Sequence, residues 1–208
     1  MTHEDVQACF TRSDGSYLFA RWGRPIVPVV FGVDDSTLEI VKGAIEAVVV
    51  LADHRMAETD PELGANLLMF FVRDWGELAD TPDLDRLVPD LPGLLQRLEA
   101  ADANQYRMFR FEPDGAIKAA FVFIRMDVGM SEVPAEDLAL AQAAQTIVLW
   151  SDRAFQGGGP LAKVEDHVVL RPNIAAIIRA GYDPVLPRVA DDPSHGLRLA
   201  ARVGRALQ

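Results

Sequence analysis

A long helix between two apolar strands is the feature that most constrains the fold of this 208-residue chain. Residues 25–32 (PIVPVVFG) and 66–73 (NLLMFFVR) are short apolar runs of the kind that predicts strands. Between them, residues 36–57 predict a helix, with Ser36 and Glu39 at the spacing of a capping box. Apolar residues occur on most sides of this helix, so we expect it to pack on more than one side.

A predicted β-hairpin follows the second strand. Residues 105–126 form two strand-like segments that turn at Pro113-Asp114-Gly115. The next helix is expected over residues 134–150, because proline at 134 fits the first turn of a helix. This succession of strand, helix, strand, hairpin and helix predicts a twisted mixed sheet of four to five strands with the two long helices packed on one side.

The remaining segments predict a C-terminal helical part. Glycines at 157–159 indicate a flexible break, residues 166–170 a short strand, and residues 172–180 and 193–207 two helices. The fold class is therefore predicted as α+β. The polar residues 1–16 are expected to be flexible, and residues 17–208 to form a single domain, divided into 17–152 and the C-terminal part 153–208.

Residues 141–152 (AQAAQTIVLWSD) resemble the active-site helix of a zincin metallopeptidase in which the metal-binding histidines and the catalytic glutamate have been replaced. That helix carries His-Glu-x-x-His, in which two imidazoles one turn apart bind zinc and the glutamate acts as the base. In this register Ala141 and Gln145 occupy the two histidine positions and Gln142 the glutamate position. Val148 stands at the glycine position and Ser151 at the third ligand position. The resemblance therefore implies a zincin-like upper half, residues 17–152, without the metal-binding motif.

The chain also resembles a domain-of-unknown-function family of predicted proteobacterial lipoproteins over roughly residues 17–186. The segments that carry the resemblance are short: Arg21-Trp22-Gly23-Arg24-Pro25-Ile26, Ala65-Asn66, Gln142-x-x-Gln145-x-x-Val148-Leu149 and Tyr182-Asp183-Pro184-Val185-Leu186. Where the family helix carries Glu and Gly, this chain has Gln142 and Val148. Membership would imply that a signal segment is removed upstream.

The candidate ligand-binding residues are Gln142, Gln145, Ser151, Asp152, His167 and Tyr182. We expect Gln145, Ser151 and Asp152 to border a deep pocket, with His167 or Tyr182 on the opposite wall, and Ala141 and Gln145 to face the strand at 119–125. A structural role competes with binding at several positions: the two glutamines can bond nearby backbone, His167 can be an exposed strand residue, and Tyr182 can anchor a turn.

Composition narrows the class of partner. The net charge of −11 argues against nucleic-acid binding, which normally needs a basic surface. The single cysteine, Cys9, excludes an intrachain disulfide and supports no zinc cluster; a thiol in a loose N-terminal segment is the expected setting. No run approaches the ~20 apolar residues that span a bilayer. The sequence by itself predicts a cytoplasmic location, or a periplasmic one if a signal segment was removed upstream.

Two functions from different classes remain open. The first is a non-catalytic binding module that holds a peptide, a glycan or a partner protein in the relic cleft, with no metal and no cofactor. The second is a hydrolase that uses Asp152, His167 and Tyr182, with His167 paired to a carboxylate as the base. A metal site built from His54, His167 and Asp152 is a further alternative that spacing allows. An oligomeric structural protein would instead present a large apolar face on the last helix.

Overall fold

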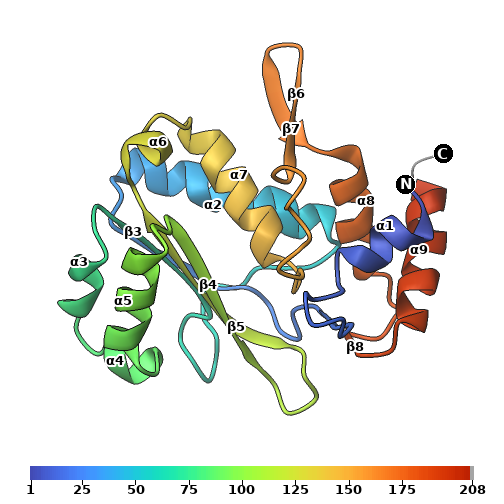
Figure 1. Ribbon diagram of the computed structural model, residues 1–208, viewed down its shortest axis with the longest axis horizontal. Helices are drawn as coiled ribbons and strands as arrows, with labels where there is room; N and C mark the ends of the chain where they lie inside the picture. Colours follow the sequence, from blue (N-terminus) through green and yellow to red (C-terminus); the bar gives the residue numbers. More distant parts are fainter. Residues whose placement is uncertain (207–208) are drawn as a thin grey trace.

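A four-stranded mixed sheet forms the centre of the computed structural model, which describes residues 1–206 (Figure 1). Its spatial order is β2 (Pro28–Phe31), β3 (Leu67–Val72), β5 (Ile117–Arg125) and β4 (Gln105–Phe111). Strands β2, β3 and β5 run parallel, and β4 pairs antiparallel with β5. The α+β class and the mixed sheet of four strands are therefore confirmed.

The β4–β5 hairpin turns where the sequence predicts. Gly115 has a φ of +87°, a conformation that glycine adopts without steric cost, and its N–H donates to Glu112 O. β5 is the most deeply buried strand because β3 and β4 pair with its two edges and helices cover both of its faces. Its outer neighbour β4 has no partner on its other side among the described residues.

Helices α2 (Asp35–Leu51) and α7 (Ala135–Thr146) pack together on one face of the sheet, as predicted (Figure 1). Their apolar side chains meet Leu67, Met69 and Phe71 of β3 in the larger core. The N-cap of α2 is Asp34, two residues before the expected cap at Ser36, because the Asp34 side chain accepts the Thr37 N–H. It ends at Leu51, several residues before the predicted end.

The opposite face of the sheet is covered by a second, smaller core. Helices α3 (Gly76–Ala79), α4 (Leu84–Leu87) and α5 (Leu91–Ala100) supply it. Their leucines pack against Phe70, Val72, Phe121 and Phe123, which alternate with the residues of the first core along β3 and β5. This alternation is the two-residue period of a strand buried on both faces.

The C-terminal part contains α8 (Pro172–Gly181), α9 (Ser194–Ala206) and the two-residue strand β8 (Val189–Ala190), which pairs with β1 (Phe19–Ala20). Both helices confirm the predicted ones; residue 207, the expected end of the last helix, lies outside the described residues. The predicted strand at 166–170 is β7 (His167–Leu170), which forms a protruding hairpin with β6 (Leu161–Val164) (Figure 1). A short helix, α6 (Val128–Ser131), links β5 to α7.

The N-terminal segment differs from the prediction of a flexible tail. Residues His3–Ala8 form helix α1, which is capped by Thr2 and packs against α9 (Figure 1). Val6, Cys9 and Phe10 are buried in the larger core, so a few apolar side chains order a segment that is otherwise polar. Cys9 is consequently not a thiol in a loose tail: burial raises its pKa to about 11.

Candidate functional site

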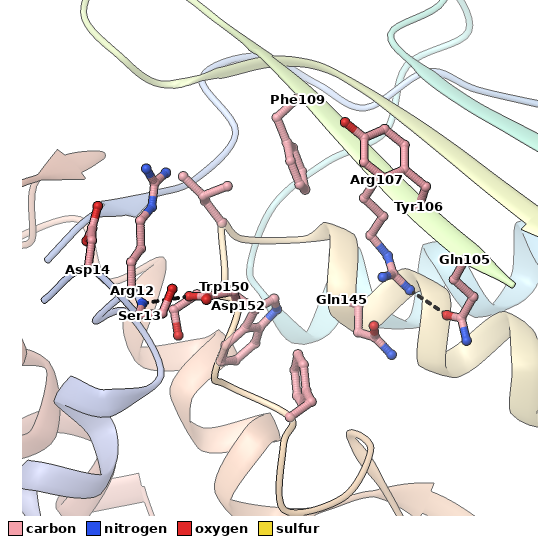
Figure 2. Close-up of a pocket in the computed structure, with 13 residues that line it drawn as sticks. Arg12, Ser13, Asp14, Gln105, Tyr106, Arg107, Phe109, Gln145, Trp150 and Asp152 are labelled. Atoms are coloured by element: carbon pink, nitrogen blue, oxygen red, sulfur yellow. Dashed lines mark hydrogen bonds between the residues drawn. The ribbon is translucent and has the colours of Figure 1, made fainter. Parts of the chain in front are cut away.

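A pocket of about 470 Å³ lies between strand β4, the C-terminal end of α7, the loop at residues 149–155 and the N-terminal turn at residues 12–14 (Figure 2). Gln105, Arg107 and Gln145 stand at one end, and Ser13 and Asp152 at the other (Figure 2). Aromatic side chains lie between these two polar ends. Such a mixture of apolar lining and a few placed polar groups is typical of ligand-binding pockets.

Strand alternation explains the β4 wall. Gln105, Arg107 and Phe109 are two residues apart, so their side chains project from the same face of the strand, toward α7. Tyr106 and Met108 project from the other face and pack on the smaller core. The predicted direction of the α7 site face is therefore corrected: Gln145 looks toward β4, at 105–109, rather than toward β5.

Arg107 is held among amides rather than carboxylates. Its Nη2 donates to Gln105 Oε1 at 2.9 Å and to Gln142 Oε1 at 2.6 Å, and Gln142 Nε2 donates to Gln105 Oε1 at 2.8 Å. Burial lowers the pKa of Arg107 to about 10, which leaves the guanidinium charged at neutral pH. Its Nε is buried and makes no hydrogen bond in the described residues. The amide cluster thus orients a cation without neutralising it.

Trp150 forms the aromatic part of the pocket. One face of its indole stacks on Phe10, with ring centroids 5.4 Å apart and an interplanar angle of 13°. Phe155 packs against it edge-on, with centroids 5.1 Å apart. Its Nε1 donates to Ala144 O at 2.9 Å, which fixes the ring against the end of α7. Trp150 therefore contributes a rigid apolar surface to the pocket.

The opposite end of the pocket is built by contacts between the N-terminal turn and the loop after α7. Ser13 N donates to Asp152 Oδ1 at 3.0 Å, and the side chain of Ser13, followed by this backbone group, keeps the pKa of Asp152 below its ordinary value. Ser151 Oγ donates to Ala8 O, and Ser151 N donates to Cys9 O. The Ser151 hydroxyl is thus engaged by backbone on both sides, because it also accepts the Arg153 N–H at 3.3 Å.

Four of the six predicted ligand-binding residues lie at or beside this pocket. Gln145, Ser151 and Asp152 line it, as expected, and Gln142 lies behind Arg107. His167 does not reach it: this residue is exposed on the β6–β7 hairpin, because the chain leaves the pocket after the loop at residues 149–155. The expectation that His167 or Tyr182 forms the opposite wall is wrong, since β4 takes that place.

Tyr182 belongs instead to a buried clamp on the end of α7. Its hydroxyl donates to Ile147 O at 2.8 Å and accepts the Trp22 N–H at 3.3 Å. Trp22 Nε1 donates to Thr146 O at 3.0 Å. The two side chains therefore satisfy carbonyls that the helix end leaves without partners. α7 consequently ends at Thr146, four residues before the predicted end, and the chain turns away toward the pocket.

The alternative metal site of His54, His167 and Asp152 is not assembled. His54 lies against the Tyr182 ring, 5.2 Å between centroids, and shares a hydrogen bond of 2.9 Å with Arg24 O. Asp152 is bonded to the Ser13 backbone, and His167 is on the hairpin. Over residues 1–206 no group of three or more His, Cys, Asp or Glu side chains is placed to hold a metal ion.

Sequence reasoning missed Arg107 and its neighbour Gln105. The signal that could have found them is the alternation in QYRMFRF, which places glutamine, arginine and phenylalanine on one face of an edge strand. Comparison with family models, with curated proteins and with solved structures gives no match to this chain. In the described part of the chain, no helix has the length and apolar character needed to cross a membrane. The geometry of the pocket is therefore the basis for a functional proposal.

Proposed function

We propose that this chain is a zincin-like binding module that holds an extended peptide along the open edge of β4, above the pocket, without cleaving it. The observation that carries this proposal is the position of the pocket directly beneath the edge of β4 that pairs with no strand in residues 1–206. An extended peptide that joins such an edge gains backbone hydrogen bonds, and its alternate side chains enter adjoining pockets. The pocket would then select the side chain that the peptide presents.

The backbone groups on this edge can be identified from the hydrogen bonds of β5. Ala120 N donates to Asn66 O, at the base of β3, so the backbone of Ala120 faces away from β4. Phe109 is the cross-strand partner of Ala120. Arg125 N, by contrast, donates to Asn104 O, so the backbone of Arg125 faces β4. In an antiparallel pair only alternate residues exchange hydrogen bonds. The backbone N–H and C=O groups of Gln105, Arg107 and Phe109 therefore point outward from the sheet.

A peptide fits these observations better than a glycan does. Phe10 stacks on one face of Trp150 and Phe155 contacts it edge-on, which leaves less of this ring for a sugar to stack on. An outward-facing backbone ladder has no counterpart in a sugar, whereas a peptide pairs with it directly. The pocket beneath the edge is large enough for one or two side chains.

The order of elements supports the zincin-like part of the proposal. β2, α2, β3, β4, β5 and α7 occur in the order that the resemblance requires, with α3, α4 and α5 inserted between β3 and β4 and α6 between β5 and α7. At the positions where the resemblance places the metal ligands, Ala141 has no donor atom and Gln145 is a poor zinc ligand. The hydrolase alternative has less support, because Asp152, His167 and Tyr182 share no hydrogen bond and only Asp152 lines the pocket.

Amide hydrogen exchange, followed by NMR, tests the proposal residue by residue. Random heptapeptides with blocked ends are selected against the immobilised protein, and the recovered peptides are synthesised. A bound peptide should slow exchange at the amides of Gln105, Arg107 and Phe109, which face outward. The amides of Tyr106 and Met108 are already bonded to β5 and should change little. Failure to recover any peptide, or protection confined to another surface, would overturn the proposal.

A pair of variants separates the backbone contribution from the side-chain contribution. Gln105→Pro removes an outward N–H, which a strand edge tolerates because β5 does not use that group. Gln105→Ala removes only the side chain and serves as the matched control. The recovered peptide should bind the proline variant about tenfold more weakly than the alanine variant, as expected for one lost backbone hydrogen bond. Equal affinities would contradict strand addition.

A further inference from the structure

The guanidinium of Arg107 is a cation without a counter-ion at the wall of the pocket. No Asp or Glu oxygen in the described residues lies within ion-pair distance of it, and its hydrogen-bond partners are the neutral amides of Gln105 and Gln142. A charge in such a poorly hydrated place is costly unless something pairs with it. The feature therefore calls for a partner from outside the chain.

The unused donors of Arg107 can be counted by atom. Nη2 is occupied, because it donates to both Gln105 and Gln142. Nε is buried and makes no hydrogen bond, and Nη1 makes none with any described residue while not being enclosed. The side-chain amide of Gln145 also lines the pocket without a hydrogen-bond partner in the described residues (Figure 2). Donors from β4 and from α7 thus converge on one end of the cavity.

Other charges at the pocket favour a ligand with a single negative charge over a dianion. Asp14 and Asp152 line the opposite end, where Asp14 accepts from Ser16 and Asp152 from Ser13. Arg12 is the other cation of the lining and is exposed at that same end. Two carboxylates and a net charge of −11 disfavour a dianion such as phosphate. A carboxylate places one charge against one guanidinium, and its two oxygens can accept separately from Arg107 Nη1 and from the Gln145 side-chain amide.

We propose that Arg107 and Gln145 bind a carboxylate of the ligand, so that this pocket selects acidic peptides. This inference rests on the proposed function and deepens it, because Arg107 belongs to the β4 edge along which the peptide would lie. The carboxylate can belong to an aspartate or glutamate side chain in the middle of the peptide or to its C-terminus. Both sources supply the same carboxylate chemistry. They can be told apart because blocking the C-terminus removes the terminal carboxylate and leaves a side-chain carboxylate in place.

Charge-matched peptides provide the direct test. Each peptide recovered by selection is made with blocked ends in an acidic form and in the corresponding Asn or Gln form, and also with a free C-terminus. The side-chain source predicts that the acidic blocked form binds at least about tenfold more tightly than its amide form. If the C-terminus is the source, only the peptide with a free C-terminal carboxylate should gain affinity. If neither acid changes the affinity of a peptide that still protects the β4 edge, this inference fails and the proposed function stands.

Variants of Arg107 locate the effect. Arg107→Met should abolish the difference between acidic and amide peptides, whereas Arg110→Met, three residues along the same strand and on its other face, should leave it intact. Arg110 is a suitable control because its side chain bonds Leu87 O and lies over Phe121. Gln145→Leu gives a second, milder variant on α7 and should reduce the difference partially. Retention of the full difference in Arg107→Met would overturn the assignment.

Small anions test the site without any peptide. The Arg107 Nε–H resonance and the Gln145 side-chain amide are followed by NMR during titration with sodium acetate, with sodium phosphate as the comparison. Acetate should shift both signals in a saturable way, and phosphate should shift them less. If acetate shifts them while no peptide binds, the carboxylate site holds and the peptide proposal fails. If acetate leaves both unmoved, or phosphate is the stronger ligand, the carboxylate assignment fails.

Discussion

Two arginines, Arg24 and Arg107, have contrasting surroundings. Arg24 contacts three carboxylates: its Nη1 lies 3.1 Å from Asp60, its Nη2 lies 3.1 Å from Glu62, and Glu112 accepts from the same guanidinium. Arg107 contacts only amides. Burial alone lowers the pKa of Arg24, but its carboxylate partners more than reverse this and raise it above the ordinary value. Burial lowers the pKa of Arg107 with no such compensation.

The difference distinguishes a cation that organises the fold from one that is available to a ligand. Around Arg24, Asp60 also accepts the backbone N–H groups of Glu62 and Leu63 and bonds buried Asn66. Asn66 in turn bonds the backbone at Pro25 and Val27 and so fixes the start of β2 and β3. All three nitrogens of the Arg24 guanidinium donate hydrogen bonds within the chain. Of the three Arg107 nitrogens, only Nη2 donates to a described residue.

The largest effect is expected from Asp60→Ala. The Asp60 side chain is 2 % exposed, so its removal leaves Arg24 and Asn66 without their shared acceptor. Arg24 keeps Glu62 and Glu112 as partners, so the cost comes mainly from the hydrogen bonds that Asp60 accepts from Asn66 and from two backbone N–H groups. At about 1.5 kcal/mol for each bond to a charged group, the loss is about 3–5 kcal/mol. Urea denaturation of the variant should show a fall of that order in the free energy of unfolding. A fall below about 1 kcal/mol would mean that the cluster contributes little to the fold.

The next effect concerns His195, another buried group with an unused nitrogen. Its Nδ1 shares a hydrogen bond of 2.7 Å with Tyr17 and its Nε2 has no partner in the described residues. Burial, and then the charges of Arg198 and Arg202, lower its pKa to about 4. The unfolded chain titrates near pH 6.5, so between about pH 6.5 and 4 only the unfolded state binds this proton.

The free energy of unfolding should consequently fall as the pH falls through this window. The slope due to His195 is about 1.4 kcal/mol per pH unit, or about 3 kcal/mol in all. His195→Gln retains a partner for the Tyr17 hydroxyl and cannot titrate. Both proteins are denatured at several pH values. Between about pH 6.5 and 4 the free energy of unfolding of the wild type should fall by about 3 kcal/mol more than that of the variant. A constant difference from pH 7 to 4 would show that His195 titrates normally.

Arg107→Met should have a smaller effect on stability. Whereas Asp60→Ala removes an acceptor that other groups use, this variant removes a cation that has no carboxylate partner in the described residues. Replacing an unpaired buried charge by an apolar side chain of similar length is neutral or stabilising, so we expect a change within about 1 kcal/mol, with an increase favoured. Thermal unfolding beside the wild type measures it. A loss above about 2 kcal/mol would place Arg107 with Arg24 as a residue that organises the fold.

The smallest effect is expected from Asp152→Asn. The side chain is exposed and makes one hydrogen bond, to Ser13 N, which the amide oxygen of asparagine can replace. The free energy of unfolding should be unchanged within error, and the pocket should keep its preference for acetate or strengthen it as one negative charge is lost. Asp14→Asn serves as the parallel variant. A weaker response to acetate in both would contradict the charge argument for the pocket.

Most of the sheet could be predicted because its signals are local. The apolar runs, the turn at Pro113-Asp114-Gly115 and the proline at the start of α7 act within a few residues. Helix α1 could not be predicted in the same way, since a mostly polar hexapeptide is ordered by Val6 and Phe10 packing on residues far along the chain. The Asp34 cap lay two residues from an equally plausible candidate at Ser36.

The candidate site was predictable only on its α7 side. Gln145, Ser151 and Asp152 follow one another closely, so helix geometry brings them near a common surface. Arg107 was hidden because both faces of QYRMFRF contain an arginine and aromatic or apolar residues, and only the tertiary position of α7 decides which face lines a pocket. Tyr182 was misplaced for the same reason: its hydroxyl is directed by contacts with Trp22 and Ile147, not by its neighbours.

The contact between α1 and α9 has a consequence for the order in which the molecule forms. The Tyr17–His195 hydrogen bond joins residues 178 apart, and the Ser13–Asp152 bond joins residues 139 apart. Contacts between such distant residues form late in folding, because closing long loops costs entropy before any contact repays it. The strands of the hairpin, by contrast, pair across a separation of only a few residues at the turn. During synthesis α1 is made first, yet it can meet its partner helix α9 only after every other helix and strand described here has been made.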